Sequence, residues 1–398
     1  MTSKADHLDR TAAEPRDKLL HTVILEHREE VNNTTRIFHL GIPRDSPPIR
    51  FLPGQWLDVY VPGVEKAGGF TITSTPREAR LAHPSTEPED AGETSPRDKP
   101  AGENGKATRG KGGPYLELAV QRSPENPPAA WLWQEADSST VDGGISSPTH
   151  SSTNPSSIIG RELRVRVGGG FVWPPPGVNV RALRRAVFVA GGVGVNPLVS
   201  MLCSLASAAA PASRPSAAGG DLEVRFLYSV KDPALPGVGG PNGGKKYRNA
   251  KNVLFLERIA RVFRQGLVKG RLELFLTGRD AGTADVEGGR GGEEGGTRTS
   301  KDGNGDGDAE NEIIVCGGDA GNGDRGDGGK DDFTIPFHPR RCTVADDVAT
   351  AVGNPRFAVV YVCGVPTMTD EFVTKLTSRG AEGGLGMEPH RVLCEKWW

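Results

Sequence analysis

Residues 187–202 read VFVAGGVGVNPLVSML and decide how the second half of the chain folds. The apolar run predicts a buried strand, the glycines predict a tight turn, and the apolar stretch opened by Pro197 predicts a helix. We expect Asn196 to cap this helix and Pro197 to take its first position. Such a turn leaves free N–H groups at the positive end of the helix dipole, so it suits a phosphate. A tight turn in any α/β protein is the competing interpretation.

The overall composition limits the size of the folded core. The chain has 398 residues, of which 36% are hydrophobic, and it contains 54 glycines and 31 prolines. Much of the chain therefore cannot belong to a packed core. The formal net charge of −2 gives no global indication of nucleic-acid binding, and no apolar run is long enough to span a bilayer. We expect no nucleic-acid partner and no membrane span.

The five cysteines and the first residues bear on the cellular compartment. The cysteines form no CxxC pair and no metal-ligand spacing, so we expect neither a disulfide framework nor a bound metal. Residues 1–17 are acidic and lack a hydrophobic stretch, which argues against a secretory signal and against an ordinary transit peptide. On these grounds we expect an intracellular, cytoplasmic protein.

Five stretches rich in glycine, proline, serine or charged residues are interpreted as long disordered insertions. Such segments cannot bury enough apolar surface to offset the entropy lost on ordering, and surface loops tolerate them. Within the last of them, residues 313–315 read IIV and are a candidate strand fragment. The five insertions cover residues 78–113, 138–157, 208–220, 234–246 and 279–332.

Without these insertions the chain divides into two domains, residues 18–180 and 184–398. The first contains six short alternating segments without long helices between them, which predicts a six-stranded antiparallel β-barrel, capped by a short helix over residues 127–135. The second alternates strands with helices, which predicts a doubly wound α/β domain with a parallel sheet. The expected barrel strands are 19–26, 34–40, 56–61, 70–74, 115–121 and 162–167. The expected strands of the second domain are 186–190, 222–230, 271–277, 357–363 and 391–396, and its helices are 197–207, 252–264, 343–352 and 367–378.

The order of the sequence motifs resembles the ferredoxin–NADP reductase superfamily. The resemblance is carried by LPGQ at residues 52–55, GFTITSTP at 69–76, and GGVGVNP at 191–197 followed by CGVPTM at 363–368. It implies a flavin-dependent oxidoreductase that transfers hydride from NAD(P)H to a bound flavin and passes electrons to an unidentified acceptor.

Shorter motifs indicate a narrower group. PGQW, VPGV, GGF and the final EKWW resemble the oxidoreductase NAD-binding domain-containing type, whose members are thought to be mitochondrial.

On the barrel, the resemblance places a flavin against Phe70, Thr71, Ile72 and Thr73. The superfamily's Arg-x-Tyr-Ser/Thr motif aligns with residues 68–71, so Phe70 can still stack on a ring and Thr71 can still donate a hydrogen bond. The phosphate-binding arginine is replaced by Gly68, however, and a hydroxyl residue expected in the capping helix is replaced by Ala129. Both departures weaken binding at the flavin phosphates. FAD is the implied flavin, and FMN or no flavin are the alternatives.

On the second domain, the resemblance assigns the pyrophosphate of NAD(H) or NADP(H) to the glycine turn. Arg279 resembles a residue that grips the 2′-phosphate of NADP, whereas the adjacent Asp280 suits NAD. Cys363 and Gly364 are expected near the nicotinamide, with Cys363 as a catalytic residue; ordinary packing of a small buried thiol is the alternative. The residues assigned to the turn are Gly191, Gly192, Val193, Gly194, Val195 and Asn196.

The last residue, Trp398, is the second expected catalytic contact. By the resemblance it covers the flavin ring and moves aside for the nicotinamide, since indole stacks on flat heterocycles. An aromatic anchor for the last strand is the alternative. A competing function is a non-catalytic NAD(H)-binding regulatory protein that has lost its flavin. Gly68 and Ala129 favour that alternative, whereas Phe70 and Thr71 favour the enzyme.

Overall fold

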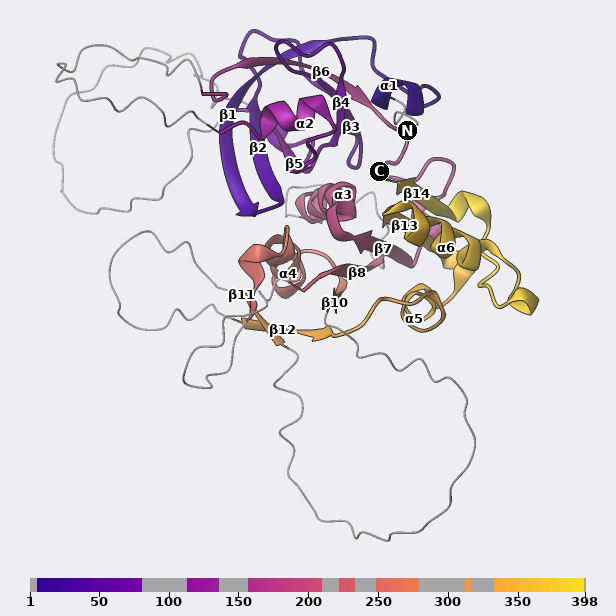
Figure 1. The fold of residues 1–398 in the computed structure, drawn as a ribbon. Helices are drawn as coiled ribbons and strands as arrows, with labels where there is room; N and C mark the ends of the chain where they lie inside the picture. The colour runs from indigo at the N-terminus through magenta and orange to yellow at the C-terminus, as the bar shows by residue number, and fades with distance from the viewer. Residues whose placement is uncertain are drawn as a thin grey trace, which may run out of the picture. The chain divides into compact units, whose positions relative to one another are not determined.

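The structure, a computed structural model, describes residues 6–80, 113–135, 157–209, 222–232, 248–278, 312–315 and 333–396. Most of each expected insertion (78–113, 138–157, 208–220, 234–246 and 279–332) lies outside the described residues. The chain splits into two compact units (Figure 1). Unit 1 comprises Met1–Glu29 and Arg36–Gly170, and unit 2 comprises Glu30–Thr35 and Phe171–Trp398.

Unit 1 is a closed antiparallel barrel, as the alternating segments predict. Its sheet has the strand order β4-β3-β6-β1-β2-β5. The two ends of this order meet where Ile72 bridges Leu118 and where the Thr73 N–H donates to the Glu117 carbonyl at 2.8 Å, so the sheet closes on itself. The strands are β1 His21–Asn32, β2 Thr35–Gly41, β3 Trp56–Tyr60, β4 Gly68–Thr71, β5 Tyr115–Gln121 and β6 Glu162–Gly168.

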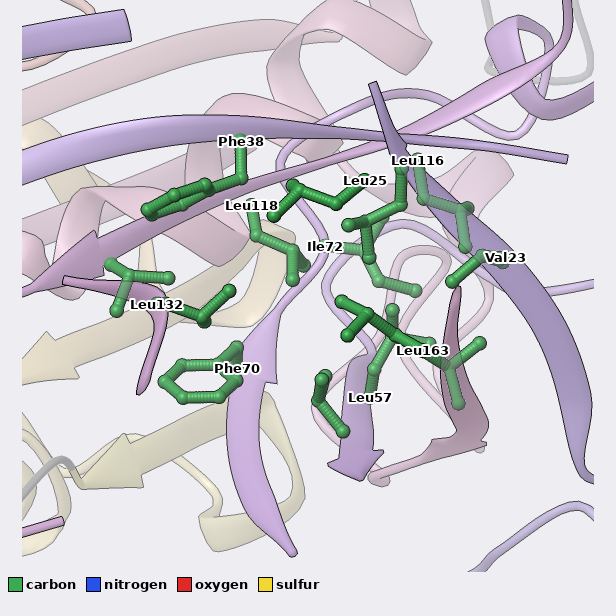
Figure 2. Packing of buried hydrophobic residues seen from close by; sticks show 14 of the residues in the cluster. Val23, Leu25, Phe38, Leu57, Phe70, Ile72, Leu116, Leu118, Leu132 and Leu163 are labelled. Carbon is green, nitrogen blue, oxygen red and sulfur yellow. The ribbon is translucent and has the colours of Figure 1, made fainter. Parts of the chain in front are cut away.

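Alternate residues of these strands fill the barrel. Leu57 of β3 lies opposite Phe70 of β4 in the register, and both belong to one buried cluster (Figure 2). The short helix α2 (Pro127–Leu132) adds Leu132 to that cluster and begins at Asn126, whose side chain accepts from the Ala129 N–H. Each fully buried aliphatic side chain of this kind contributes roughly 1.5–3 kcal/mol. A shift of one residue in the strand pairing would point these core side chains to the outside of the barrel, so their burial fixes the register.

Unit 2 contains a sheet with the strand order β14-β13-β7-β8-β10-β12-β11-β9. The first five strands pair in parallel with one another, and β12 also pairs in parallel with β10. The order reverses between β7 and β13, so their carboxyl ends form the topological switch point of a doubly wound sheet. The five strands are β7 Arg185–Gly191, β8 Glu223–Lys231, β10 Gly270–Thr277, β13 Ala358–Gly364 and β14 Val392–Lys396. The helices between them are α3 Val195–Ala209, α4 Leu256–Arg264, α5 Ala349–Val352 and α6 Pro366–Thr377.

Some local details differ from the sequence-based predictions. Helix α3 begins at Val195 after a 3-10 turn over Gly192–Gly194, so the prediction of Asn196 as the cap and Pro197 as the first helical residue was wrong. Pro197 still lies in the first turn, where its missing N–H breaks no helical bond. The fragment at residues 313–315 is a strand, because β11 Glu312–Val315 pairs with the unpredicted β12 Phe333–His338. Helix α1 (His7–Arg10) and the two-residue β9 (Arg248–Asn249) were also not predicted.

Candidate functional site

The glycines at the switch point allow the backbones of two neighbouring strands to approach each other. A β-carbon at Gly194 would be 2.5 Å from the Cys363 carbonyl carbon and 2.8 Å from the Gly364 nitrogen. A β-carbon at Gly191 would be 2.7 Å from the Met368 sulfur. Neither position can carry a side chain without moving the backbone or helix beside it. Contacts within the chain therefore already require glycine at residues 191 and 194, independently of the expected approach of a phosphate.

Gly192 differs from these two glycines. Its φ is +56°, and apart from its two chain neighbours no described residue has an atom within 4 Å of the place where a β-carbon would be. The backbone is therefore open at this residue, immediately before the 15-residue helix α3. The first turn of α3 carries no acidic side chain that would neutralise the positive end of the dipole. An open, positively polarised turn at the switch point is the arrangement that binds phosphate groups in such sheets.

The side chains assigned to the turn contribute less than its backbone. Val195 and Asn196 are buried, whereas Gly191, Gly192 and Val193 are partly exposed. A ligand above the turn would therefore meet the backbone of residues 191–193.

Cys363 and Gly364 end β13 directly opposite this turn. The side chain of Cys363 is 0% exposed, in a strand of which every residue is buried, which favours the packing alternative for its thiol. The backbone carbonyl of Cys363, by contrast, lies directly beside Gly194. Val365, the next residue but one, is 57% exposed and begins α6 as its N-cap. Val365 lies within the sequence motif at residues 363–368, to which the sequence analysis assigned no separate role for this side chain.

Arg279 and Asp280, expected at the adenosine end, lie outside the described residues, and so does Trp398. The structure does describe the residues that precede Arg279. The Asp232 N–H donates to the Thr277 carbonyl at 2.7 Å, and Lys231 lies beside Gly278. The basic last residue of β8, Lys231, and the acidic residue that follows it, Asp232, thus share the edge where β10 ends. Their position at the end of a strand was a signal that the sequence offered.

On the barrel, Phe70 occupies the space of the missing arginine. A β-carbon at Gly68 would be 2.6 Å from Phe70 Cε2 and 2.8 Å from Pro128 Cβ, so the Phe70 ring lies over Gly68 next to α2. Phe70 is 8% exposed and belongs to the barrel core, where Figure 2 shows it near Leu132. The ring expected to stack on a flavin is thus packed inside the barrel.

The other residues assigned to the flavin are also buried in the barrel wall. Ile72 belongs to the core, and the Thr73 hydroxyl donates to Glu117 Oε1 at 2.8 Å. Thr71 and Ala129 are buried as well. The side chains of residues 70–73 are therefore buried within unit 1.

A buried ion cluster on the outer face of β3 was missed from the sequence. His7 Nε2 lies 2.9 Å from Asp58 Oδ1, and its ring covers Gly69, where a β-carbon would be 2.6 Å from Nε2. Asp58 also accepts from Arg166 at 2.7 Å and from Arg16 at 3.1 Å. Burial opposes ionisation of Asp58, but the bonds from His7, Arg166 and Arg16 outweigh it and hold its pKa below the ordinary value. The glycine pair at 68–69 is thereby explained by two intrachain contacts.

No group of three or more His, Cys, Asp or Glu side chains in the described ranges is arranged to hold a metal ion. No helix within those ranges is long and apolar enough to cross a membrane.

The fold has the three features that the resemblance to the ferredoxin–NADP reductase superfamily implies. They are a closed antiparallel barrel, a doubly wound sheet and a glycine turn at the switch point of that sheet. The resemblance to the narrower group is confirmed by curated relatives named Oxidoreductase NAD-binding domain-containing protein 1. The protein from Bos taurus is 29% identical over 245 residues, which cover 58% of this chain and 56% of the relative. The one from Homo sapiens is 28% identical over 199 residues, covering 50% and 46%. The chain thus spans about half the length of the curated relatives it matches. No protein family model matches the chain.

Solved structures of similar fold include a flavohemoglobin and a ferredoxin NADP+ reductase. A flavohemoglobin from Malassezia yamatoensis with bound FAD and heme has a TM-score of 0.49 and 12% identity, covering 98% of this chain and 62% of that one. A ferredoxin NADP+ reductase from Neisseria gonorrhoeae with bound FAD and NADP has a TM-score of 0.46 and 11% identity, covering 96% and 99%.

Proposed function

We propose that the chain binds NAD(H) or NADP(H) at residues 191–196 and acts as an NAD(P)H-dependent oxidoreductase. The observation that carries this proposal is the open backbone at Gly192, where φ is +56° and, apart from its two chain neighbours, no described residue has an atom within 4 Å of a β-carbon position. That opening precedes a long helix at the switch point of a doubly wound sheet, where dinucleotides bind in folds of this type. The name of the curated relatives, which includes NAD binding, supports the same reading.

A flavin as the hydride acceptor is the finer part of the proposal. The barrel lacks both phosphate anchors of the superfamily pattern, since Gly68 carries no guanidinium and Ala129 no hydroxyl. Moreover, the place of the arginine is filled by the Phe70 ring. The residues present therefore do not fit the phosphates of FAD in the superfamily's manner. The proposal of bound FAD depends on Phe70 and Thr71, and it requires Phe70 to turn away from Gly68.

The contribution of this chain's own residues would be binding, orientation and exclusion of water, because the nicotinamide carries the hydride chemistry. We propose that the backbone of residues 191–193 holds the pyrophosphate and that Gly364 and Val365 border the nicotinamide. The backbone of Cys363 would then border the turn, and its thiol would pack in the core beside the sheet. The electron acceptor and the roles of Arg279 and Trp398 stay proposals from the resemblance.

The second candidate is a non-catalytic NAD(H)-binding regulatory protein. It is favoured by the packing of Phe70 over Gly68 and Pro128, which closes the space that a flavin phosphate anchor would need. Under this alternative the dinucleotide turn keeps its role and the barrel serves as a structural unit.

One spectrum separates the two candidates. The full chain is purified, incubated with excess FAD or FMN, desalted, and scanned between 350 and 500 nm (roughly the range of oxidised flavin absorption, which the cofactor alone sets). An oxidised flavin spectrum that is bleached by anaerobic NADH supports the oxidoreductase. A colourless protein that binds NADH without reducing a dye supports the regulatory protein.

A further inference from the structure

Three arginines from separate parts of the barrel meet at the C-terminal end of α2. Arg28 Nη1 donates to the Gln134 carbonyl at 2.9 Å, and Arg36 Nη1 donates to the Trp133 carbonyl at 3.2 Å. Arg36 also lies over the Trp133 ring, 4.2 Å from its centroid, and Arg122 lies 5.8 Å from the same centroid. Arg28, Arg36 and Arg122 are called the arginine cluster below.

The carboxylate of Glu135 pairs with the arginine cluster. It is hydrogen-bonded to Arg36 and lies 3.8 Å from Arg28 Nη2. The hydrogen bond from Arg36 and the charges of Arg36, Arg28 and Arg122 hold the pKa of Glu135 below its ordinary value. All three guanidinium groups of the cluster therefore act on this one carboxylate.

The two sides of this pairing differ in exposure. The Arg36 side chain is 6% exposed, whereas that of Glu135 is 67% exposed. The guanidinium of Arg36 is thus held in place by Trp133 and by the helix end, while the carboxylate can leave into solvent. An exposed ion pair contributes little stability, so displacing Glu135 would cost little.

We propose that the arginine cluster is a binding site for a phosphate group, and that Glu135 occupies this site when the ligand is absent. A phosphate monoester carries nearly two negative charges and accepts paired N–H bonds from guanidinium forks. It would therefore make more charge-assisted hydrogen bonds to the cluster than the carboxylate of Glu135 does. The Trp133 ring holds the Arg36 plane in a fixed orientation, which reduces the entropy lost on binding.

This site is independent of the proposed dinucleotide turn. The arginine cluster belongs to unit 1, and residues 191–196 belong to unit 2. Substitutions in one need not change the other, and failure of either proposal leaves the other standing.

The test is isothermal titration calorimetry of the full chain with inorganic phosphate and, separately, with AMP. Glu135→Gln removes the competing carboxylate and is expected to tighten phosphate binding by about threefold to fivefold, the upper end of what an exposed ion pair contributes. Arg122→Gln is expected to weaken binding by a similar factor. Arg122 is exposed, so this variant should keep the fold, which thermal unfolding checks. Arg164→Gln, an exposed β6 position, is the matched control and should bind as the parent does.

Comparing the affinities for AMP and inorganic phosphate shows which kind of phosphate compound the site binds. Tighter binding of AMP than of phosphate assigns the site to a nucleotide monoester, and equal binding assigns it to the phosphoryl group alone. The proposal is overturned if Glu135→Gln leaves phosphate affinity unchanged. It is equally overturned if Arg164→Gln weakens binding as much as Arg122→Gln, because the effect is then one of overall charge.

Discussion

Gly194 lies so close to the backbone of Cys363 that a β-carbon on Gly194 would be 2.5 Å from the Cys363 carbonyl carbon. The turn after β7 and the end of β13 therefore hold each other by backbone contact. Because the Cys363 carbonyl group belongs to the backbone of β13, it cannot move aside for a β-carbon at residue 194 as a flexible side chain would. This contact fixes the position of the open residue Gly192 within the turn.

The first prediction concerns the stability provided by that contact. Gly194→Ala is expected to lower the free energy of unfolding by about 2–3 kcal/mol, the usual cost of overpacking. The measurement is the thermal midpoint of the full chain by circular dichroism. Gly380→Ala is the control, since a β-carbon at Gly380 meets nothing within 4 Å and no left-handed φ is required there. Equal midpoints for the two variants would contradict the close contact.

The second prediction separates binding from strain. Gly192 and Gly266 both have left-handed φ, +56° and +65°, and open space around the β-carbon position. Asp substitutions at the two sites should therefore cost similar stability, about 1 kcal/mol each. Only Gly192→Asp places a negative charge at the proposed pyrophosphate, so its dissociation constant for NADH should rise about tenfold or more. A tryptophan-to-nicotinamide fluorescence titration measures this, and equal affinities in the two variants would count against the assignment of the turn.

The third prediction is a pH dependence that arises from Asp58. Its folded pKa is lowered by His7, Arg166 and Arg16 against the effect of burial, whereas an unfolded aspartate titrates near about 3.9. The stabilisation is therefore fully present above the unfolded pKa and is lost as pH falls through the lower folded value. Between about pH 5 and 2 the parent should lose stability more steeply than Asp58→Asn.

At neutral pH, Asp58→Asn should itself cost about 3 kcal/mol, since it leaves the partly buried guanidinium groups of Arg16 and Arg166 without their carboxylate. Urea unfolding at a series of pH values measures both effects. Asp45→Asn, at an exposed position, is the control and should follow the parent curve. An Asp58→Asn curve parallel to the parent below pH 5 (about the upper end of carboxylate titration) would show that the cluster does not stabilise the fold through ionisation.

The fourth prediction concerns Cys363. Because the thiol is fully buried and the wall against Gly194 is backbone, Cys363→Ala should lower stability by about 1–2 kcal/mol through a small cavity. NADH affinity should change less than about twofold, which is below 0.5 kcal/mol. If the variant binds NADH normally but loses NADH-dependent dye reduction more than a hundredfold (about 2.7 kcal/mol of activation free energy), the thiol is catalytic and the packing role is insufficient.

The sequence predicted the elements that follow from periodicity. The barrel strands and the alternating second half follow from apolar spacing, and Ile72, Leu57 and Val189 all lie in the cores where that spacing places them. Local signals were less exact at helix starts, because Asn196 and Pro197 fit either a cap or a first turn. The short β12 was missed because it follows a long stretch without apolar periodicity.

The candidate site was harder to predict because tertiary contacts decide it. His7 and Asp58 are 51 residues apart, and nothing local to either indicates their pairing. Gly68 was interpreted only as a missing arginine, whereas the Phe70 ring and Pro128 give the glycine a packing reason. Likewise, Lys231 and Asp232 lie beside the end of β10 because β8 and β10 are neighbours in the sheet. The spacing of residues along the chain does not show which strands are neighbours.

The most direct test of dinucleotide binding is a calorimetric titration of the folded full chain with NADH, NADPH and their oxidised forms. Saturable binding of one molecule per chain is expected for at least one of them, with a dissociation constant between about 1 μM and 1 mM, the usual range for such ligands. The Gly192→Asp variant should lose that binding while Gly266→Asp keeps it. If folded protein shows no saturation with any of the four nucleotides at millimolar concentration, the turn at residues 191–196 is not a dinucleotide site.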